Sequence, residues 1–454
     1  MANLWTKITS AVTRKTGSEK LPRILSRDEH PVSRKHISDS ALKVMHRLRS
    51  GGFDAFLVGG GVRDLMLGKQ PKDFDIATNA TPEDVRQLFR NSRIIGRRFK
   101  IVHVRFGREI IEVTTYRGNH EDGNGKTAVA GESGMLLRDN VYGTLEEDAV
   151  RRDFTVNALY YCSEKFTVLD HVGGLSDLNK REVRIIGDAA SRYQEDPVRM
   201  LRAVRFAAKL DFTLEARTAA PLKKLAPLLE QIPAARLFDE VLKLFMEGQA
   251  LRVYALLKHY NLFRPLFPAT QAVLDGDDPS AAALIEQGLV NTDTRISQNK
   301  PVTPAFLFAV MLWPVVRREM AQLQAEGIPE IPALHQAAQN CVSAQQQHTS
   351  IPKRFSMPMR DIWELQLRLP RRTGRRAQEL LEHRYFRAGY DFLLLREQAG
   401  EIPEELGPWW TAFQEADEGT REGMQKKIAG DRPARNNNGR RRRKPRHRNP
   451  PRSS

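Results

Sequence analysis

Strand-like and helix-like stretches are distributed unevenly along this 454-residue chain. Between residues 37 and 180, short apolar runs bounded by glycines, such as FDAFLVGG, alternate with amphipathic helical stretches. From residue 197 to about residue 415, helical patterns follow one another with almost no strand pattern between them. We therefore expect an α+β protein: an N-terminal domain with a small mixed sheet of about five strands and helices, then an all-helical C-terminal half.

Local signals mark several of these elements. Ser38 or Ser40 can cap a helix that Gly51 ends, and apolar residues recur between them at helical spacing. Gly107 and Arg108 join the strand-like runs FKIVHVRF and EIIEVTTY, a pattern typical of a β-hairpin. The Gly-rich, polar stretch 118–140 is expected to be an inserted or mobile loop.

The chain is strongly basic, with a formal net charge of +17. About half of this excess lies in the arginine-rich segment 431–454, which its composition predicts to be disordered. The rest of the chain is basic as well. Such a charge favours a polyanionic partner.

Cysteine usage and hydropathy constrain the location. Two cysteines, Cys162 and Cys341, are too few for a disulfide scaffold or for a zinc site built of cysteines alone. No run of eighteen apolar residues occurs, so no transmembrane segment is expected, and the N-terminal residues lack the apolar core of a signal peptide. We therefore expect a cytoplasmic protein.

Two aspartates in the expected strand DFDIAT are the first candidates for chemistry. Alternate residues of a strand face the same side, so Asp73 and Asp75 point together, and two carboxylates on a rigid strand suit Mg²⁺. Glu112 alternates with apolar neighbours in EIIEVTTY and would be a third ligand if that strand lay beside Asp75. A solvated strand edge would show the same D-x-D pattern, so the pattern alone does not decide.

Glycines stand upstream of this pair of aspartates. Gly59, Gly60 and Gly61 precede a short expected helix, where a backbone without side chains can approach phosphate groups. Arg63 adds a charged donor suited to a triphosphate. A tight turn would explain the glycines equally well.

A second candidate site lies in YQEDPVRMLRAVRFAAK, at the start of the helical half. Asp196 precedes a proline that can begin a helix, and Arg199, Arg202 and Arg205 follow at helical spacing. An acid that accepts and an arginine that donates can pair with the Watson–Crick edge of adenine or cytosine, which present the same order of donor and acceptor. Such a pair would not by itself choose between the two bases, and an ion-paired helix surface is the alternative interpretation.

Four segments together resemble a known family. LVGGGVRD, DFDIAT, IIEVTTYRG and RRDFTVNAL occur in the order and spacing of the class II nucleotidyltransferases, which comprise the tRNA CCA-adding enzymes and the bacterial poly(A) polymerases. The flanking GMLLRDNVYGTLEEDAVRRDF and the arginine-rich C-terminus are similar to the poly(A) polymerase branch. The resemblance covers roughly residues 30–415.

The resemblance implies roles for particular residues. Two Mg²⁺ ions would be held by Asp73 and Asp75, with Asp153 as a further catalytic carboxylate. From the residues alone, RRDFTVNALYY also reads as the start of a helix that Asp153 caps. The resemblance implies that the nucleotide is bound by Gly59, Gly60, Arg63, Arg151, Arg152, Asn157, Asp196, Arg199 and Arg202.

The resemblance also implies an activity. The chain would add AMP from ATP, without a template, to RNA 3′ ends and release pyrophosphate, in RNA processing and decay, with RNA-decay proteins as a class of partner. The shared motifs leave a CCA-adding enzyme as the alternative. A non-catalytic RNA-binding protein with the same fold is a third hypothesis, against which the intact Asp73, Asp75 and Arg63 argue.

The helical half is expected to hold the RNA. Arginines at 371–376 would contact phosphates without reading sequence, whereas Trp409 and Trp410 are expected in the core rather than stacked on bases. Composition and resemblance together suggest five segments: a basic lead-in (1–36), a nucleotidyltransferase domain (37–180), a helical nucleotide-recognition domain (181–265), a helical RNA-binding domain (266–415) and a disordered arginine-rich tail (416–454).

Overall fold

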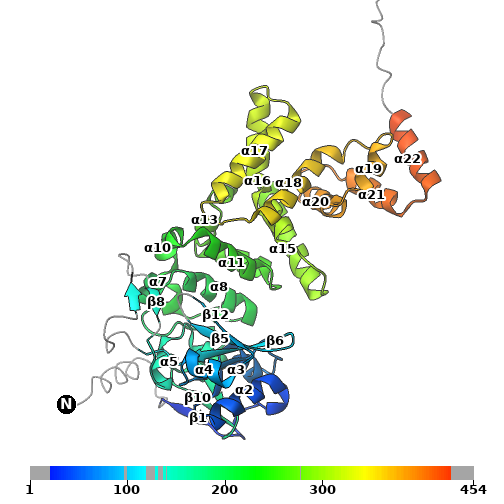
Figure 1. Ribbon diagram of the computed structural model, residues 1–454. Helices are drawn as coiled ribbons and strands as arrows, with labels where there is room; N and C mark the ends of the chain where they lie inside the picture. Colours follow the sequence, from blue (N-terminus) through cyan, green and yellow to red (C-terminus); the bar gives the residue numbers. More distant parts are fainter. Residues whose placement is uncertain are drawn as a thin grey trace, which may run out of the picture. The chain divides into compact units, whose positions relative to one another are not determined.

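The computed structural model describes residues 21–96, 100–118, 128–130, 136–139, 141–276 and 278–430. The chain forms two compact units, Met1–Ser356 and Met357–Ser454. The first unit holds a mixed β-sheet followed by helices, and the second is helical in its described part (Figure 1). The expected α+β class with a helical C-terminal half is therefore confirmed. The expected domain boundaries near residues 180 and 265 both lie inside the first unit.

The main sheet has eight strands. β3 and β6 are parallel, and every other neighbouring pair is antiparallel. The expected hairpin joins β5 to β6 through Gly107, whose φ of +61° a glycine adopts without strain. In spatial order the strands are β1 (Arg23–Leu25), β10 (Thr167–Asp170), β9 (Leu159–Cys162), β2 (Phe56–Val58), β3 (Asp75–Thr78), β6 (Glu109–Thr115), β5 (Ile101–Phe106) and β4 (Ser92–Ile95).

The expectation of about five strands was too low. Strand β1 lies in the expected lead-in, and its three residues are too few to show a period of two. Strand β9 begins in the stretch RRDFTVNALYY, which reads as the start of a helix but forms the 3₁₀ helix η3 (Thr155–Asn157) and then a strand. All four residues of β9 are buried, so the strand lacks the alternation of polar and apolar residues that would have identified it.

Two helices cover one face of this sheet. α2 (Asp39–Ser50) contacts β3 and β6, and α4 (Pro82–Leu88) contacts β4, β5 and β6. As the sequence predicts, the Ser38 side chain caps α2 by accepting a hydrogen bond from the backbone. Ile111 and Val113 of β6 are buried, as expected, so Glu112 between them points to the opposite face. The Glu112 side chain therefore lies on the face of β6 opposite to Ile111 and Val113.

The remaining elements of the first unit are mainly helical. Two small sheets accompany them: β11 (Glu182–Val183) with β12 (Thr213–Leu214), and β7 (Ala128–Ala130) with β8 (Leu136–Asp139). The other elements are η1 (Arg34–His36), α3 (Gly60–Met66), α5 (Leu145–Arg151), α6 (Gly174–Lys180), α7 (Ala189–Glu195), α8 (Val198–Leu210), α9 (Ala216–Ala219), α10 (Leu222–Leu225), η4 (Ala226–Gln231), α11 (Ala234–Phe245), α12 (Ala250–His259), α13 (Phe263–Leu266), α14 (Pro268–Leu274), α15 (Pro279–Ser297), α16 (Pro304–Ala325) and α17 (Glu330–Gln345).

The second unit has its own apolar core. Trp410 is fully buried in it, as expected, and donates its indole N–H to the Leu369 carbonyl at 3.1 Å. Trp409 is partly buried and stacks on Phe413, with ring centroids 4.7 Å apart. The helices are α18 (Lys353–Arg368), which begins before the boundary between the units, α19 (Arg376–Leu381), α20 (Phe386–Gln398), α21 (Leu406–Glu415) and α22 (Glu418–Gly430).

Several expectations concern segments at the edge of the described chain. Helix α22 occupies part of the segment expected to be disordered from residue 416, while 431–454 lie outside the described residues. In the expected lead-in, β1 and η1 are ordered elements, and residues 1–20 lie outside the described chain. Most of the expected loop 118–140 also lies outside it. Among the described helices, none combines the length and the hydropathy needed to cross a bilayer.

Candidate active site

Carboxylates gather around the start of β3. Asp75 is the first residue of this strand and lies beside Glu112 in the parallel pairing with β6. Asp73 precedes the strand and is exposed, whereas Asp75 is partly buried. The pKa of Asp75 is raised to about 6, because the carboxyl is buried and the nearby Glu112 and Asp73 disfavour its charge, against the opposing field of Arg152.

This donor set fits a divalent cation. A bound cation relieves the repulsion between adjacent carboxylates, and oxygen ligands suit Mg²⁺. Within the described part of the chain, however, no three His, Cys, Asp or Glu side chains lie close enough together to form a preassembled metal site. The Oε1 atom of Glu112 lies instead 3.1 Å from the Nε2 atom of His103 on β5. Asp75 and Glu112 are thus neighbours on the sheet, with Asp73 just before β3, but these carboxylates do not form a preassembled coordination site.

Gly59 lies where the charged groups of this site meet. It follows β2 and precedes α3, with φ +74°, a backbone conformation that favours glycine. A Cβ atom at Gly59 would lie 3.7 Å from Nη1 of Arg152 and 3.8 Å from Oδ2 of Asp75. A ligand at this bare backbone would therefore meet a guanidinium and a carboxylate at once, as a phosphate group with its cation requires.

Arg63 is buried rather than open to a ligand. Its side chain donates to Oδ1 of Asp64 from Nε at 2.9 Å and from Nη2 at 2.7 Å, and to Oδ1 of Asn157 from Nη1 at 2.5 Å. The structure thus brings Arg63 and Asn157 together, as expected of two residues of one site. A direct contact between Arg63 and a triphosphate would require some of these hydrogen bonds to be exchanged.

Arg151 and Arg152 have different surroundings at the end of α5. The Nη1 atom of Arg151 donates to the Gly118 carbonyl. Arg152 contacts Asp148 and Tyr160 and is the member of the pair that lies beside Gly59. The field of Arg152 reaches Asp75, whereas Arg151 is held at the chain segment that follows β6.

Asp153 already has a cationic partner. Its Oδ2 atom accepts from Arg202 Nε at 2.7 Å and lies 2.5 Å from Arg202 Nη2, and its Oδ1 atom accepts from the Phe154 amide at 2.8 Å. Burial alone would raise the pKa of Asp153, but Arg202 and these hydrogen bonds lower it to about 2. Because the charge is already paired, the geometry favours Asp153 as the residue that orients Arg202.

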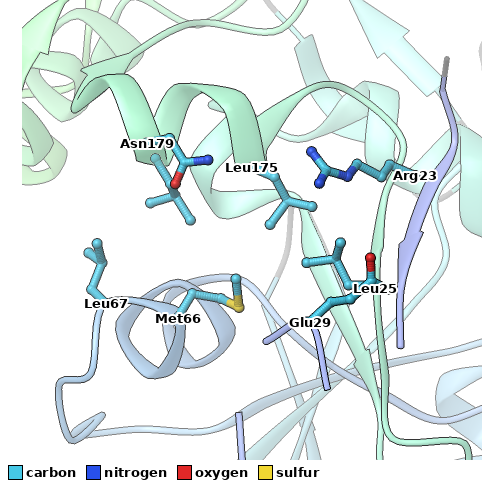
Figure 2. Close-up of a pocket in the computed structure, with 8 residues that line it drawn as sticks. Arg23, Leu25, Glu29, Met66, Leu67, Leu175 and Asn179 are labelled. Carbon is cyan, nitrogen blue, oxygen red and sulfur yellow. The ribbon is translucent and has the colours of Figure 1, made fainter. Parts of the chain in front are cut away.

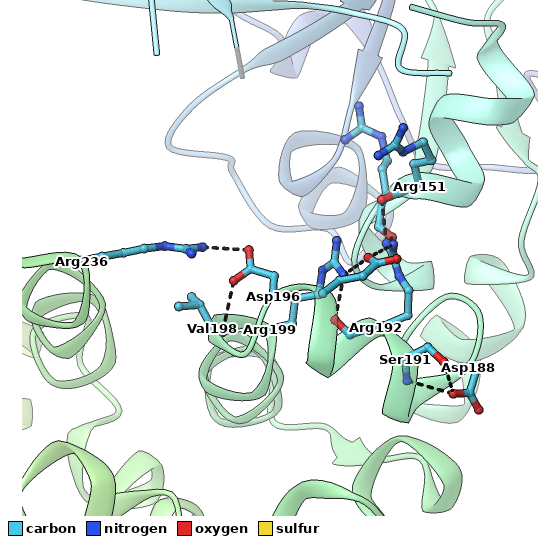
Figure 3. A network of polar contacts seen from close by, with 10 residues as sticks. Arg151, Asp188, Ser191, Arg192, Asp196, Val198, Arg199 and Arg236 are labelled. Carbon is cyan, nitrogen blue, oxygen red and sulfur yellow. Dashed lines mark hydrogen bonds and ion pairs between the residues drawn. The ribbon is translucent and has the colours of Figure 1, made fainter. Parts of the chain in front are cut away.

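Two acids at the C-terminal end of α7, Glu195 and Asp196, hold arginines of α7, α8 and α11 (Figure 3). Glu195 accepts from Nη1 of Arg192 at 2.7 Å and from Nη1 of Arg199 at 2.5 Å. Asp196 accepts from Nη2 of Arg236, on α11, at 2.8 Å. Asp196 and Arg199 therefore lie on the same turn, as expected, but each is engaged with another side chain.

Arg192 links the turn that carries Asp196 and Arg199 to the backbone at Arg151 and Arg152. Its Nη2 atom donates to the backbone carbonyls of Arg151 at 2.7 Å and Arg152 at 2.8 Å (Figure 3). Burial and the neighbouring Arg199 lower the pKa of Arg192 to about 10, so the side chain remains a cation at neutral pH. The segment expected to bind phosphates is thus joined to the segment expected to bind the base.

Four residues of this site are not evident from the sequence: Asp148, Tyr160, Arg192 and Arg236. Tyr160 stands in an apolar run, and Arg236 is the only cation in the first turns of α11, so neither stretch has a pattern that indicates a site. Their relevance arises from contacts across 8 to 41 residues of chain.

A separate pocket of about 160 Å³ lies at the other end of α3 (Figure 2). Met66 and Leu67, which line it, lie at the C-terminal end of that helix, whereas Gly59 precedes its N-terminus. The pocket is therefore distinct from the candidate active site. Its lining consists of Arg23, Leu25, Glu29, Met66, Leu67, Leu175, Leu178 and Asn179.

Models of three protein families match this chain. The model described as the poly A polymerase head domain matches residues 55–184 and includes the carboxylates and glycines of the site. The model described as a probable RNA- and SrmB-binding site of polymerase A matches residues 211–274, and the polymerase A arginine-rich C-terminus matches residues 326–448.

Curated relatives extend this similarity over most of the chain. Poly(A) polymerase I of Escherichia coli O6:H1 is 52% identical over 397 residues, which are 86% of this chain and 85% of the relative. Poly(A) polymerase I of Salmonella typhimurium is 49% identical over 433 residues, covering 94% of this chain and 92% of the relative. The CCA-adding enzyme of Streptococcus suis is 37% identical over 231 residues, only 50% of this chain and 55% of that enzyme.

Solved structures support the fold. The CCA-adding enzyme of Bacillus stearothermophilus in complex with CTP aligns with a TM-score of 0.53 and 26% identity, covering 86% of this chain and 82% of that one. The similarity to CCA-adding enzymes is thus broad in fold, whereas the sequence similarity to poly(A) polymerases is both higher and longer.

Proposed function

The chain belongs to the family of bacterial poly(A) polymerases and is a polynucleotide adenylyltransferase, and we propose that it adds AMP from ATP to RNA 3′ ends without a template. Pyrophosphate is the leaving product, and the reaction serves RNA processing and decay. The observation that carries the proposal is that Asp75, Arg152 and the bare backbone of Gly59 meet at one point. That arrangement suits the triphosphate of a nucleotide with its cation.

Asp73 and Asp75 are proposed to hold two Mg²⁺ ions, with Glu112 as a third carboxylate. The observation behind this assignment is the raised pKa of Asp75, which reflects a buried carboxyl next to Glu112 and Asp73, against the opposing field of Arg152. When bound, the ions activate the terminal ribose hydroxyl of the RNA and stabilise the oxygen of the departing pyrophosphate.

The chain's own residues then position the substrate. The backbone at Gly59 and Gly60 leaves room for the phosphates, and Arg152 supplies a charge-assisted donor beside them. Asn157 borders the same region, with its carbonyl oxygen 3.9 Å from the Cβ position of Gly59, and Asn157 and Arg151 are proposed to contact the nucleotide sugar. Positioning and electrostatics of this kind account for most of the catalysis of phosphoryl transfer.

Asp196 and Arg199 are proposed to bind the base, with Arg202 beside them. An aspartate acceptor and an arginine donor suit adenine and cytosine alike. Arg236 and Glu195 fix the orientation of these two side chains, so the choice of ATP over CTP is proposed to reside in that network. Asp153 contributes by holding Arg202.

The second unit is proposed to contribute RNA contacts. Arg371, Arg375 and Arg376 are exposed around the start of α19 and can contact phosphates without reading sequence. The match at residues 211–274 supports a further RNA-facing segment in the first unit, and proteins of RNA decay are the proposed protein partners. A cytoplasmic location is proposed from the two cysteines, both free and buried.

A CCA-adding enzyme is the alternative function, because both groups share the head domain and the fold. It is less favoured, since the sequence similarity to CCA-adding enzymes covers half of the chain and is lower. An experiment that separates the two offers an A-ending RNA primer and a tRNA lacking its CCA end, each with ATP alone and with ATP plus CTP. Long tails from ATP alone are expected; addition of three defined nucleotides to the tRNA would overturn the proposal.

Asp75→Ala tests the metal assignment in the same assay. Incorporation is expected to fall by about a thousandfold or more, because charge stabilisation at the reacting phosphate is lost, while the Kd for RNA stays unchanged. Asp54→Ala is a matched control, since Asp54 is an exposed aspartate next to the same sheet. Normal turnover of Asp75→Ala would show that the metal ligands lie elsewhere.

A further inference from the structure

Arg152 is held from behind by two buried side chains, Tyr160 and Asp148. The phenol of Tyr160 accepts from Nε of Arg152 at 2.9 Å and donates to Oδ2 of Asp148 at 2.7 Å. The same oxygen of Asp148 accepts from Nε of Arg152 at 3.1 Å and lies 3.0 Å from Nη2. The three polar groups thus form a closed triangle. Tyr160 is fully buried and Asp148 is 1% exposed, so this triangle is shielded from solvent.

The Asp148 carboxylate is satisfied on its other side as well. Its Oδ1 atom accepts from the backbone amide of Arg117 at 3.2 Å and lies 3.6 Å from Nε of the same arginine. Burial would raise the pKa of Asp148, but Arg152, Arg117 and the Tyr160 hydroxyl together lower it, so the group is an anion at neutral pH. A buried anion with fixed hydrogen bonds is a rigid anchor for a guanidinium.

The anchor leaves one end of the guanidinium turned toward the site. Nε and Nη2 of Arg152 are the nitrogens bound to Tyr160 and Asp148. Nη1 is the nitrogen that lies 3.7 Å from the Cβ position of Gly59, where the Asp75 carboxylate is also near. The Tyr160 ring adds to the anchor, because the guanidinium carbon lies 5.2 Å from its centroid.

We propose that Tyr160 and Asp148 are positioning residues for nucleotide binding, which aim Nη1 of Arg152 at a phosphate group of ATP. The inference rests on the proposed function, in which Gly59 and Asp75 border the triphosphate. A long arginine side chain loses much rotamer freedom when it binds a ligand, and a protein that fixes the side chain beforehand avoids that loss at the moment of binding. Tyr160 therefore acts through Arg152 and does not touch the nucleotide.

A purely structural role is the competing interpretation, because Tyr160 also packs in an apolar cluster with Val58 and Ala77. Tyr160→Phe separates the two, since it keeps the ring and removes only the hydroxyl. The Kd for ATP of the full chain, measured by equilibrium binding without turnover, is expected to rise about tenfold. The Kd for RNA is expected to stay unchanged, which general loss of folded structure would not allow.

Tyr161→Phe is the matched control. Tyr161 is the adjacent tyrosine on β9, and within the described chain its buried hydroxyl has no hydrogen-bond partner. Removal of that hydroxyl is expected to leave the Kd for ATP unchanged. Equal effects of Tyr160→Phe and Tyr161→Phe would overturn the proposal, because the anchor would then be irrelevant.

A double-mutant cycle decides whether Tyr160 acts through Arg152. In an Arg152→Lys background, which cannot form the triangle, Tyr160→Phe is expected to cause no further rise in the Kd for ATP. Additive effects would overturn the proposal. Should Tyr160→Phe not fold, Asp148→Asn in the same cycle gives the same two outcomes. Failure of the wild-type chain to bind ATP at all would instead refute the proposed function, so the two failures remain distinguishable.

Discussion

Asp75 and Asp153 are both candidate catalytic carboxylates, and the structure shifts their pKa values in opposite directions. Burial and two nearby carboxylates raise the pKa of Asp75 to about 6, whereas Arg202 lowers that of Asp153 to about 2 despite burial. A carboxylate whose charge is disfavoured gains most from a cation, and one that is already paired gains least. At the residue scale, this contrast supports Asp75 as a metal ligand and Asp153 as a support for Arg202.

Asp153→Asn tests the paired state through the pH dependence of stability. The folded-state pKa of Asp153 lies below its unfolded value, so its stabilising contribution is complete above about pH 4 and is lost as the pH falls toward about 2. We expect the variant to lose about 2 kcal/mol of unfolding free energy at pH 7. The difference in unfolding free energy between the variant and the wild type, measured by urea titration, should decrease by about 1 kcal/mol as the pH falls from 6 to 3. A difference that is constant with pH would contradict the ion pair.

At the scale of elements, short loops and helix ends carry the site. Asp170 ends β10 and, though only 1% exposed, accepts hydrogen bonds from four successive backbone amides at the start of α6. The loop after β2 likewise places Gly59 against the end of α5, where Arg152 follows. The Asp170 carboxylate satisfies backbone amides that the start of the helix leaves unpaired.

Asp170→Asn is expected to destabilise the first unit by about 2 to 3 kcal/mol, because an amide has fewer acceptor sites and faces the backbone amides with a donor. Asp188→Asn is the control, since Asp188 caps α7 through the same kind of contact, to Ser191, at an exposed position. Asparagine caps a helix about as well as aspartate, so the control should change the unfolding free energy by only a few tenths of a kcal/mol. Equal losses in urea unfolding would show that burial of Asp170 has no special role.

At the scale of the whole molecule, net charge is the property that bears most directly on RNA binding. A net charge of +17 favours binding to RNA phosphates. This binding weakens as the salt concentration rises, because the release of counterions from the RNA then becomes less favourable. In the described part of the second unit, exposed arginines near α19, including Arg375 and Arg376, are available to contact RNA phosphates. Affinity for RNA is therefore expected to depend little on RNA sequence and strongly on salt.

The double variant Arg375→Ala/Arg376→Ala measures this contribution. If both side chains contact phosphates, the slope of log affinity for single-stranded RNA against log salt should decrease in magnitude by about 1.4, at roughly 0.7 for each contact. Lys43→Ala/Lys165→Ala, which removes two exposed cations near the sheet, should leave the slope unchanged. An unchanged slope in the arginine variant would place the RNA on another surface.

Features that depend on neighbours within a few residues can be predicted from the sequence. The hairpin through Gly107, the cap at Ser38 and the alternation that separates Glu112 from Ile111 follow from turn geometry, capping and the period of a strand. The α+β class follows from the same local periods. The order of the four motifs was enough to indicate the family to which the similarity to poly(A) polymerases assigns the chain.

Contacts between residues distant in the sequence depend instead on how the elements pack. Asp75 lies beside Glu112 because β3 and β6 are parallel neighbours, and Asp196 pairs with Arg236 because α8 and α11 pack together. Tyr160 shows why such contacts escape sequence reasoning. In a fully buried strand its pattern is that of an apolar core residue, and its hydroxyl acquires a role only when folding brings Arg152 and Asp148 to it. Which side chains become hydrogen-bond partners depends on the packing of the whole unit. Capping, turn and periodicity signals, in contrast, extend over only a few neighbouring residues.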